Sequence, residues 1–193
     1  NGIEVVASQI IPIGSRTGVP QMQKVRAAKP EAIFQAGIVG PQMAQFFQAY
    51  HQLGMKQPVL ASFNLSIPAY LKVAKDLMDG VAFIDAYDPD KERTKAFIAA
   101  YQKEYGSVPF SLPGYGYDGL YFIVDAIKRA GSADREKIRA AMASTKGWSG
   151  VMGAKGSSVN LSATDRRGFD PEGAVVRLIR DNNHGPAVHS GTK

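Results

Sequence analysis

The segment VPQMQKVRAAKPEAIFQAGIVGPQMAQFFQAY, residues 19–50, decides the fold class of this 193-residue chain. We expect a helix over residues 19–28, because Pro20 stands in its first turn, where a missing N–H costs nothing. Residues 32–36 form a short apolar run that is typical of a buried strand, and Gly37 ends it. A second helical pattern follows. The segment therefore predicts helix, strand and helix in direct succession, which is the alternation of an α/β protein.

The same alternation continues on both sides of this segment. From Pro41 to Gly54, apolar residues spaced by three and four predict a helix with one apolar face. Further strands are expected at 3–7, 58–61, 81–84 and 174–179, and further helices at 67–78, 90–105, 115–130 and 134–144. We expect the tail from His184 onward to be loose. Strands separated by helices predict βαβ units, and hence a parallel, flavodoxin-like sheet with helices on both faces.

The helices after Asp88 differ from the earlier ones because no strand separates them. The helix expected at 115–130 carries a wide apolar stripe of Leu120, Ile123, Val124 and Ile127. Such a stripe must be covered, and this chain offers no second sheet to cover it. The sequence therefore predicts an incomplete second lobe that consists mainly of helices.

Composition excludes several classes of protein. The chain has no cysteine, so disulfides, thiol nucleophiles and cysteine-based zinc sites are excluded. Its net charge is +6, but the basic residues are scattered along amphipathic helices, which favours a solvated surface over a nucleic-acid site. No apolar run is long enough to span a bilayer. The start, Asn1–Glu4, lacks the basic and apolar regions of a signal peptide, so an exported form would be processed or truncated.

Several short motifs resemble a known family when they are taken in order. They are QKVRAAKPEAI at 23–33, Gly37 with Met43 and Gln45, Leu53-Gly54, Gly80-Val81, Phe97 with Tyr101, Tyr117-Asp118, Ala130-Gly131 and WSGVMG at 148–153. In this order and spacing, residues 2–182 resemble the C-terminal portion of the type I periplasmic solute-binding proteins. The resemblance is to the leucine/isoleucine/valine, or branched-chain amino acid, family that serves ABC transporters.

The resemblance implies two α/β lobes that are joined by three crossings and hold a ligand between them. It implies that residues 1–86 form the α/β core of the second lobe. Residues 87–146 would be the helical part of the first lobe, and residues 147–193 would cross back to the second lobe and end in a strand and tail. The family's N-terminal half has no counterpart in this sequence. The implied partners are that missing half and membrane permease subunits, and the implied location is periplasmic or otherwise extracytoplasmic and membrane-associated.

Ligands of open α/β sheets bind at the carboxyl ends of the strands. The ligand-binding residues that we expect there are Gly37, Ile38, Val39, Ser62, Phe63, Asn64, Asp85 and Tyr87, together with Tyr115 from the first lobe. The resemblance places Phe63 where amino-acid binders carry the acid that pairs with the ligand's ammonium. A buried ammonium needs an anionic partner. This departure favours an aromatic or aliphatic carboxylate over a simple amino acid.

The sequence leaves undecided the roles of two acidic residues and the choice among the binding function and two alternatives. Asp85 and Asp118 are the remaining acidic candidates, and Asp118 is expected in the first turn of its helix, where interaction with the helix dipole is the simpler interpretation. No metal-ligand spacing, catalytic motif or cofactor motif occurs, so we expect a binding protein without cofactor and not an enzyme. A flavodoxin-like hydrolase would need a nucleophile such as Ser62. A ligand-sensing domain of a regulator or receptor would share the same fold.

Overall fold

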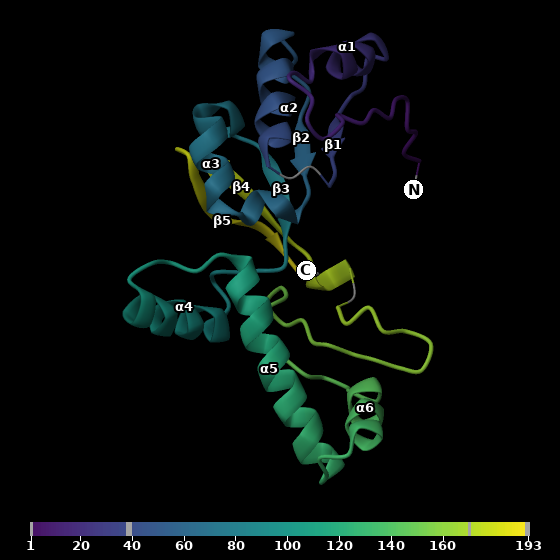
Figure 1. The fold of residues 1–193 in the computed structure, drawn as a ribbon, viewed down its shortest axis with the longest axis vertical. Helices are drawn as coiled ribbons and strands as arrows, with labels where there is room; N and C mark the ends of the chain where they lie inside the picture. The colour runs from purple at the N-terminus through teal and green to yellow at the C-terminus, as the bar shows by residue number, and fades with distance from the viewer. Residues whose placement is uncertain (1, 38–39, 170, 192–193) are drawn as a thin grey trace. The chain divides into compact units, whose positions relative to one another are not determined.

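The computed structural model describes residues 2–37, 40–169 and 171–191 (Figure 1). The chain divides into two compact units. Unit 1 comprises residues 1–84 and 178–185, and unit 2 comprises residues 85–177 and 186–193. In the described part of the chain, every helix is too short or too polar to cross a lipid bilayer.

The described strands form one five-stranded sheet in the order β1-β2-β3-β4-β5. Their bounds are Ile33–Gln35 for β1, Val59–Ala61 for β2, Ala82–Asp85 for β3, Val175–Arg180 for β4 and Asn183–Ser190 for β5. The pairs β1–β2 and β2–β3 are parallel, with Ile33 opposite Val59 and Leu60 opposite Ala82. The α/β fold is thus confirmed, and β1, β2 and β3 form the parallel part of a mixed sheet. Parallel neighbours place the carboxyl ends of β1, β2 and β3 at one edge of the sheet.

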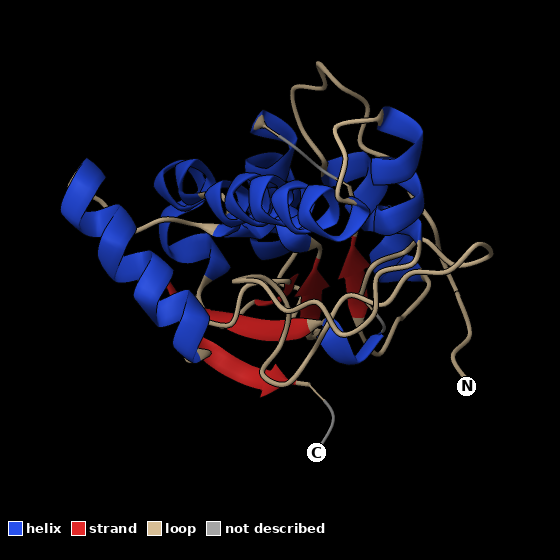
Figure 2. Ribbon diagram, turned by 90° about the horizontal axis from the view of Figure 1, so that it is seen from below, coloured by secondary structure: helices blue, strands red, loops and turns tan. Residues whose placement is uncertain are grey.

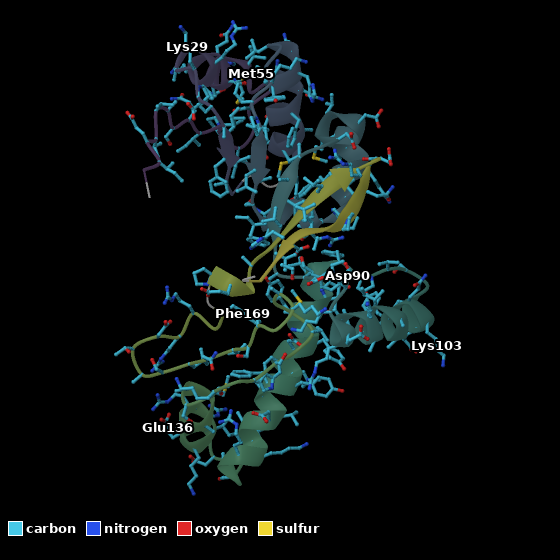
Figure 3. All side chains as sticks on the ribbon, turned by 180° about the vertical axis from the view of Figure 1, so that it is seen from behind. Lys29, Met55, Asp90, Lys103, Glu136 and Phe169 are labelled. Carbon is cyan, nitrogen blue, oxygen red and sulfur yellow. The ribbon has the colours of Figure 1, made fainter. Side chains whose placement is uncertain are left out.

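Three helices cover the sheet in unit 1. They are α1 (Val19–Ala27), α2 (Pro41–Gln52) and α3 (Pro68–Ala74), with the short 3₁₀ helices η1 (Phe63–Ser66) and η2 (Lys75–Met78) after β2 and α3. Apolar side chains of all three helices share one core with Ile33, Ala61 and Phe83 of the strands. Met55, labelled in Figure 3, is 3% exposed in this core.

Helices on both faces were expected, but α1, α2 and α3 lie side by side within one core. Right-handed crossovers that step in one direction along a sheet place successive helices on the same face. Phe34, which alternates with the core residues Ile33 and Gln35, is accordingly 60% exposed. In unit 1, the opposite face of β1 is therefore open to solvent.

The strand expected at 3–7 is not formed, and this prediction was wrong. Among the described residues, the segment pairs with no strand, and Ile3 and Val5 are 87% and 79% exposed. Alternating apolar residues favour a strand only when a neighbouring strand supplies hydrogen bonds and an apolar surface supplies burial. Neither is available to this segment here.

Unit 2 contains the helices α4 (Glu92–Tyr105), α5 (Ser111–Ala130) and α6 (Arg135–Ala143), and the 3₁₀ helix η3 (Pro171–Gly173). Two helix starts differ from expectation. Lys91 is the residue that precedes α4, where Asp90 was expected to cap; Asp90 is labelled in Figure 3. The helix α5 begins four residues before its expected start, because Pro113 falls in its first turn, where proline is tolerated. Asp134 caps α6 as a side-chain acceptor for the Lys137 N–H.

The apolar stripe of α5 is uncovered in the structure. Leu120, Ile123 and Ile127 are 63%, 44% and 38% exposed. Most of the segment between α6 and β4 is drawn as tan loop in Figure 2, and it adds no strand that could cover the stripe within the described residues. This agrees with the expectation that the mainly helical lobe is incomplete.

The tail from His184 was expected to be loose, and this was wrong. It forms β5, which follows β4 after the two-residue turn Asp181-Asn182. Both turn residues have positive φ, 49° and 57°, which matches the twist of a hairpin and is tolerated best by Asp, Asn and Gly. The His184 ring fixes the strand in unit 1, because its Nε2 lies 2.7 Å from the Leu65 carbonyl oxygen and it packs on Phe83.

Candidate functional site

In unit 1, the loops after β1 and β2 lie next to each other. The Ser62 N–H donates to the Gln35 carbonyl at 2.9 Å, which joins the two strand ends. Gly37 and Gly40 have φ of 66° and 68°, a conformation that side chains disfavour, so glycine is required at both turns. The Gly40 N–H donates to the Tyr70 hydroxyl at 3.0 Å. This hydrogen bond fixes the backbone of Gly40, the residue that precedes α2.

The structure brings four of the expected ligand-binding residues together at these loops. Gly37 is exposed, Phe63 opens η1 with 47% of its surface exposed, and Asn64 and Ser62 are half-buried. Ile38 and Val39 lie outside the described residues. An exposed aromatic ring next to glycine turns can pack against an apolar solute.

Buried polar groups lie beneath these loops. Within the described residues, neither amide atom of Gln35 has a hydrogen-bond partner, and the same holds for the Ser62 hydroxyl oxygen. Gln35 is only 2% exposed. An unpaired buried polar group costs roughly 1 to 3 kcal/mol, so such groups often mark sites of water or ligand. Gln35 could not be predicted from the sequence, since a glutamine inside an apolar strand belongs to no motif.

In unit 2, Asp85 pairs with Arg177. The Arg177 Nη1 lies 3.2 Å from Asp85 Oδ2, and the two residues are 7% and 1% exposed. The Ala86 N–H donates to Asp85 Oδ1 at 2.8 Å. Burial raises the pKa of Asp85 from 3.8 to about 6, because desolvation of the carboxylate outweighs the attraction of Arg177. Asp85 is thus an internally paired carboxyl group.

The two tyrosines expected at the site have different environments. Tyr87 is 2% exposed, and within the described residues its hydroxyl has no hydrogen-bond partner. Tyr115 is 42% exposed and lies in the second turn of α5. Burial raises the pKa of both phenols; the Asp85 charge adds to this at Tyr115, whereas at Tyr87 the Arg177 charge lowers the pKa and the Asp85 charge raises it. Asp85, Tyr87 and Tyr115 therefore form one electrostatically coupled group in unit 2.

The raised pKa of Asp85 predicts a specific pH dependence of stability. Between about pH 4 and pH 6 the folded chain binds this proton more tightly than the unfolded chain, so its contribution to the free energy of unfolding is present in acid and lost as the pH rises. Asp85→Asn removes that contribution. We expect the difference between wild type and Asp85→Asn to change by about 2 to 3 kcal/mol across this window. Urea unfolding at pH 4, 5, 6 and 7 measures it, and a constant difference would contradict the assignment.

Asp118 is the centre of a second polar arrangement in unit 2. It is 8% exposed, and its two carboxylate oxygens accept the N–H groups of Val151 and Met152, each at 2.8 Å. It lies in the third turn of α5, so the expected role in the first turn was wrong: the helix begins earlier, at Ser111. The carboxylate binds a backbone segment more than thirty residues away and does not cap its own helix.

Two side chains donate to the carbonyl groups of the same segment: Lys91, which precedes α4, and Thr94, which lies in its first turn. Lys91 Nζ donates to the Met152 carbonyl at 2.8 Å, and Thr94 Oγ1 donates to the Val151 carbonyl at 2.6 Å. Lys91 is 7% exposed, and burial lowers its pKa while the Asp118 charge raises it. Both the N–H and the carbonyl groups of residues 151 and 152 are therefore satisfied by buried side chains, a role for Lys91 and Thr94 that the sequence did not reveal.

An open apolar hollow of about 200 Å³ lies between α5 and the segment 148–169 of unit 2. It is lined by Tyr115, Asp118, Gly119, Phe122, Trp148, Met152, Val159 and Phe169, the last of which is labelled in Figure 3. The Phe122 and Trp148 rings meet edge to face at 5.1 Å. The Asp118 oxygens are engaged by backbone N–H groups, so the hollow is essentially apolar.

A parallel sheet with loops at its strand ends, followed by a helical unit, is the arrangement that the sequence motifs suggested. The profile of the family described as periplasmic binding proteins matches residues 1–180. The chain belongs to this periplasmic binding protein family. No match is found among proteins of curated function.

Several solved structures share the fold of this chain. A leucine-binding protein LivK from Thermotoga maritima is 24% identical with a TM-score of 0.76, over 93% of this chain and 49% of that protein. An extracellular ligand-binding receptor from Rhodopseudomonas palustris HaA2 is 19% identical with a TM-score of 0.78, over 96% and 55%. A branched-chain amino acid ABC transporter structure from Thermus thermophilus with bound valine is 16% identical with a TM-score of 0.74, over 96% and 52%. This periplasmic binding protein chain therefore spans about half the length of these structures.

Proposed function

We propose that this periplasmic binding protein chain is part of an extracytoplasmic solute-binding subunit of an ABC importer, which captures a small organic solute by closure of two lobes and breaks no bond. The observation that carries the proposal is the match to the periplasmic binding protein family over residues 1–180, together with loops at the carboxyl ends of β1 and β2 that expose an aromatic ring. A solute binds at such strand ends in open α/β sheets.

The solute that we propose is an aromatic or aliphatic carboxylate. Among the described residues of the loops after β1 and β2, Gly37, Ser62, Phe63 and Asn64 offer backbone N–H, hydroxyl, amide and ring surfaces but no carboxylate. Asp85 carries one, but it is buried and paired with Arg177. An ammonium group taken out of water needs an unengaged anion, whereas a carboxylate can be bound by N–H and hydroxyl donors. These features support an organic acid over an amino acid.

The proposed ligand-binding surface keeps the residues that the sequence indicated. Gly37, Phe63 and Asn64 of unit 1 and Tyr115 of unit 2 are at least partly exposed, so a solute can reach them. Ser62, Asp85 and Tyr87 have buried polar atoms, and their contact with a solute stays a prediction.

The exposed stripe of α5 supports a further part of the proposal. Leu120, Ile123 and Ile127 would be covered by the N-terminal half of the same protein, which also completes the first lobe. Related structures are about twice as long as this chain. The intact mass of the protein in its source tests this, since a mass of 20.8 kDa would oppose it and a mass near twice that value would support it.

A thermal-shift panel tests the function. Benzoate-type acids, short aliphatic acids, leucine, isoleucine and valine are each added in excess to the protein as isolated from its source. A true ligand raises the unfolding temperature by mass action, and mass spectrometry shows it unchanged afterwards. A shift with amino acids alone would overturn the carboxylate class. Turnover that Ser62→Ala abolishes would instead support the hydrolase alternative.

Truncation of Phe63 is expected to weaken solute binding. Phe63→Ala removes the exposed ring at the start of η1, and we expect the dissociation constant of an aromatic acid to rise about 10- to 100-fold, since burying one ring contributes roughly 1.5 to 3 kcal/mol. Phe34→Ala is the matched control, because Phe34 is similarly exposed but lies within β1 and not at a strand end. Calorimetry measures both. Equal affinities in the two variants would contradict the placement of the site.

A further inference from the structure

In unit 1, one edge of the sheet has no neighbouring strand among the described residues. β1 stands first in the strand order and pairs with β2 on one side. The Ile33 N–H and the Gln35 carbonyl both form hydrogen bonds on the β2 side, so the backbone groups of Phe34 between them face the outer side. The Phe34 ring is also 60% exposed. A free strand edge beside an exposed ring is a surface on which a further strand can pair.

Residues 3–7 alternate like a strand, but their contacts to unit 1 come from the residues that follow them. Ile11 packs against the core of unit 1, and the Gln45 amide of α2 donates to the Ser15 carbonyl. Ile3, in contrast, is 87% exposed. The segment is therefore anchored to unit 1 at its end, while the strand-like part lacks a neighbour within the described residues.

The helices beside this segment also lack polar partners. The side-chain oxygens of Gln21 in α1 and Gln45 in α2 are buried, and neither has a hydrogen-bond partner in the described part of the chain. These two helices contact each other, and α1 connects residues 3–7 to β1. Because buried polar groups are normally paired, the part of unit 1 next to the free strand edge is incomplete.

The handedness of the chain connections decides where a strand at 3–7 would lie. Helices α1, α2 and α3 share one core, and right-handed crossovers place them on one face only when every step runs in the same direction along the sheet. A strand at 3–7 that reaches β1 through α1 therefore lies beyond the free edge of β1. Direct pairing of the two would leave Phe34 uncovered. A strand between them that reaches residues 3–7 through its own helix steps in the opposite direction, which places that helix on the open face over Phe34.

We propose that the N-terminal half of the same protein inserts one strand, followed by a helix, between residues 3–7 and β1. The strand pairs with both neighbours, and the helix packs on Phe34. Related structures are about twice as long as this chain, which leaves enough length for such a unit. The inference rests on the proposed function for the existence of that half. It goes beyond that function because the half that covers α5 of unit 2 then also completes the sheet of unit 1.

Hydrogen exchange followed by mass spectrometry tests the insertion on the protein as isolated from its source. We expect the amides of residues 4–7 and of Phe34 to exchange at least about 100-fold more slowly than those of an unstructured peptide of the same sequence. Lys56, in the exposed loop before β2, is the fast-exchanging control. Exchange of residues 4–7 at the rate of the unstructured peptide would overturn the inference.

A pair of double-cysteine variants distinguishes an inserted strand from direct pairing. Neighbouring strands lie about 4.8 Å apart, so one intervening strand separates residues 3–7 from β1 by about 10 Å. A disulfide needs Cα atoms within about 7 Å of each other. Phe34→Cys is combined in turn with Glu4→Cys and Val5→Cys, one for each face of the strand, and we expect no disulfide to form on oxidation of either variant. A disulfide in either one would show direct pairing and overturn the insertion.

Phe34→Ser and Val73→Ser compare two side chains of unit 1 with nearly equal exposure, 60% and 59%. In the protein from its source we expect Phe34→Ser to lower the unfolding temperature by about 5 °C or more, because the inserted helix buries the ring, and Val73→Ser on α3 by about 1 °C. Equal shifts would show that Phe34 is not covered. Slow exchange without solute binding would contradict the proposed function alone, whereas solute binding with free exchange at residues 4–7 would contradict the insertion alone.

Discussion

Asp118→Asn is expected to lower the free energy of unfolding by about 3 kcal/mol, although it only replaces one carboxylate oxygen by an NH₂ group. The carboxylate accepts two backbone N–H groups, and an amide can accept only one of them while its NH₂ group meets the other donor. Hydrogen bonds to a buried charge contribute roughly 1.5 to 3 kcal/mol each. The substitution also removes the negative charge near the buried Lys91 ammonium. For a chain of this length the unfolding temperature should fall by about 10 °C.

Asp125→Asn is the matched control on the same helix. Asp125 forms an ion pair with Arg129 at 2.8 Å, but both side chains are more than a third exposed. Such surface pairs contribute roughly 0 to 1 kcal/mol, so this variant should unfold within about 3 °C of wild type. Urea and thermal unfolding at pH 7 measure both variants. If the two midpoints fell by the same amount, the backbone contacts of Asp118 would not have the weight that we assign to them.

Asp118 also shows where sequence reasoning reached its limit. The α/β alternation of residues 19–85 could be predicted because periodicity, proline and glycine act locally, within a few residues. The partners of Asp118 lie 33 and 34 positions away in the sequence, and no local pattern indicates them. The same holds for Lys91 and Thr94, whose acceptors belong to the same distant segment.

The missed hairpin has a different cause, because its signal was present. Asp181 and Asn182 are residues that tolerate positive φ, and the valine and isoleucine run before them is a strand. The following strand carries Gly185 and Pro186, which weaken its pattern. It forms nonetheless, because β4 offers a partner and His184 anchors it to Leu65. At the candidate site, the strand-end loops could be placed from the sequence, but the ion pair of Asp85 with Arg177 could not.

Gly150→Ala is expected to be at least as damaging as the loss of the Asp118 charge. A Cβ atom at position 150 would lie well inside van der Waals contact with all three atoms of the Asp118 carboxylate. The carboxylate cannot move away without breaking its two bonds to the Val151 and Met152 N–H groups. The variant therefore has either a steric overlap between the new Cβ and the carboxylate, or two buried N–H groups without a partner. Either one lowers the free energy of unfolding by about 3 kcal/mol or more. Glycine is required at this position by packing, since its φ is not positive.

Gly116→Ala separates this steric effect from the general effect of adding a methyl group. Gly116 lies inside α5, and no atom is within 4 Å of the position that its Cβ would take. Alanine is the better helix former by about 1 kcal/mol, so this variant should be more stable than wild type. Thermal unfolding of the two variants should therefore move in opposite directions. In the double variant Gly150→Ala with Asp118→Gly, the overlap is relieved. The double variant should therefore lose less free energy of unfolding than the two single variants lose together. Strict additivity would show that position 150 is constrained by something other than the Asp118 carboxylate.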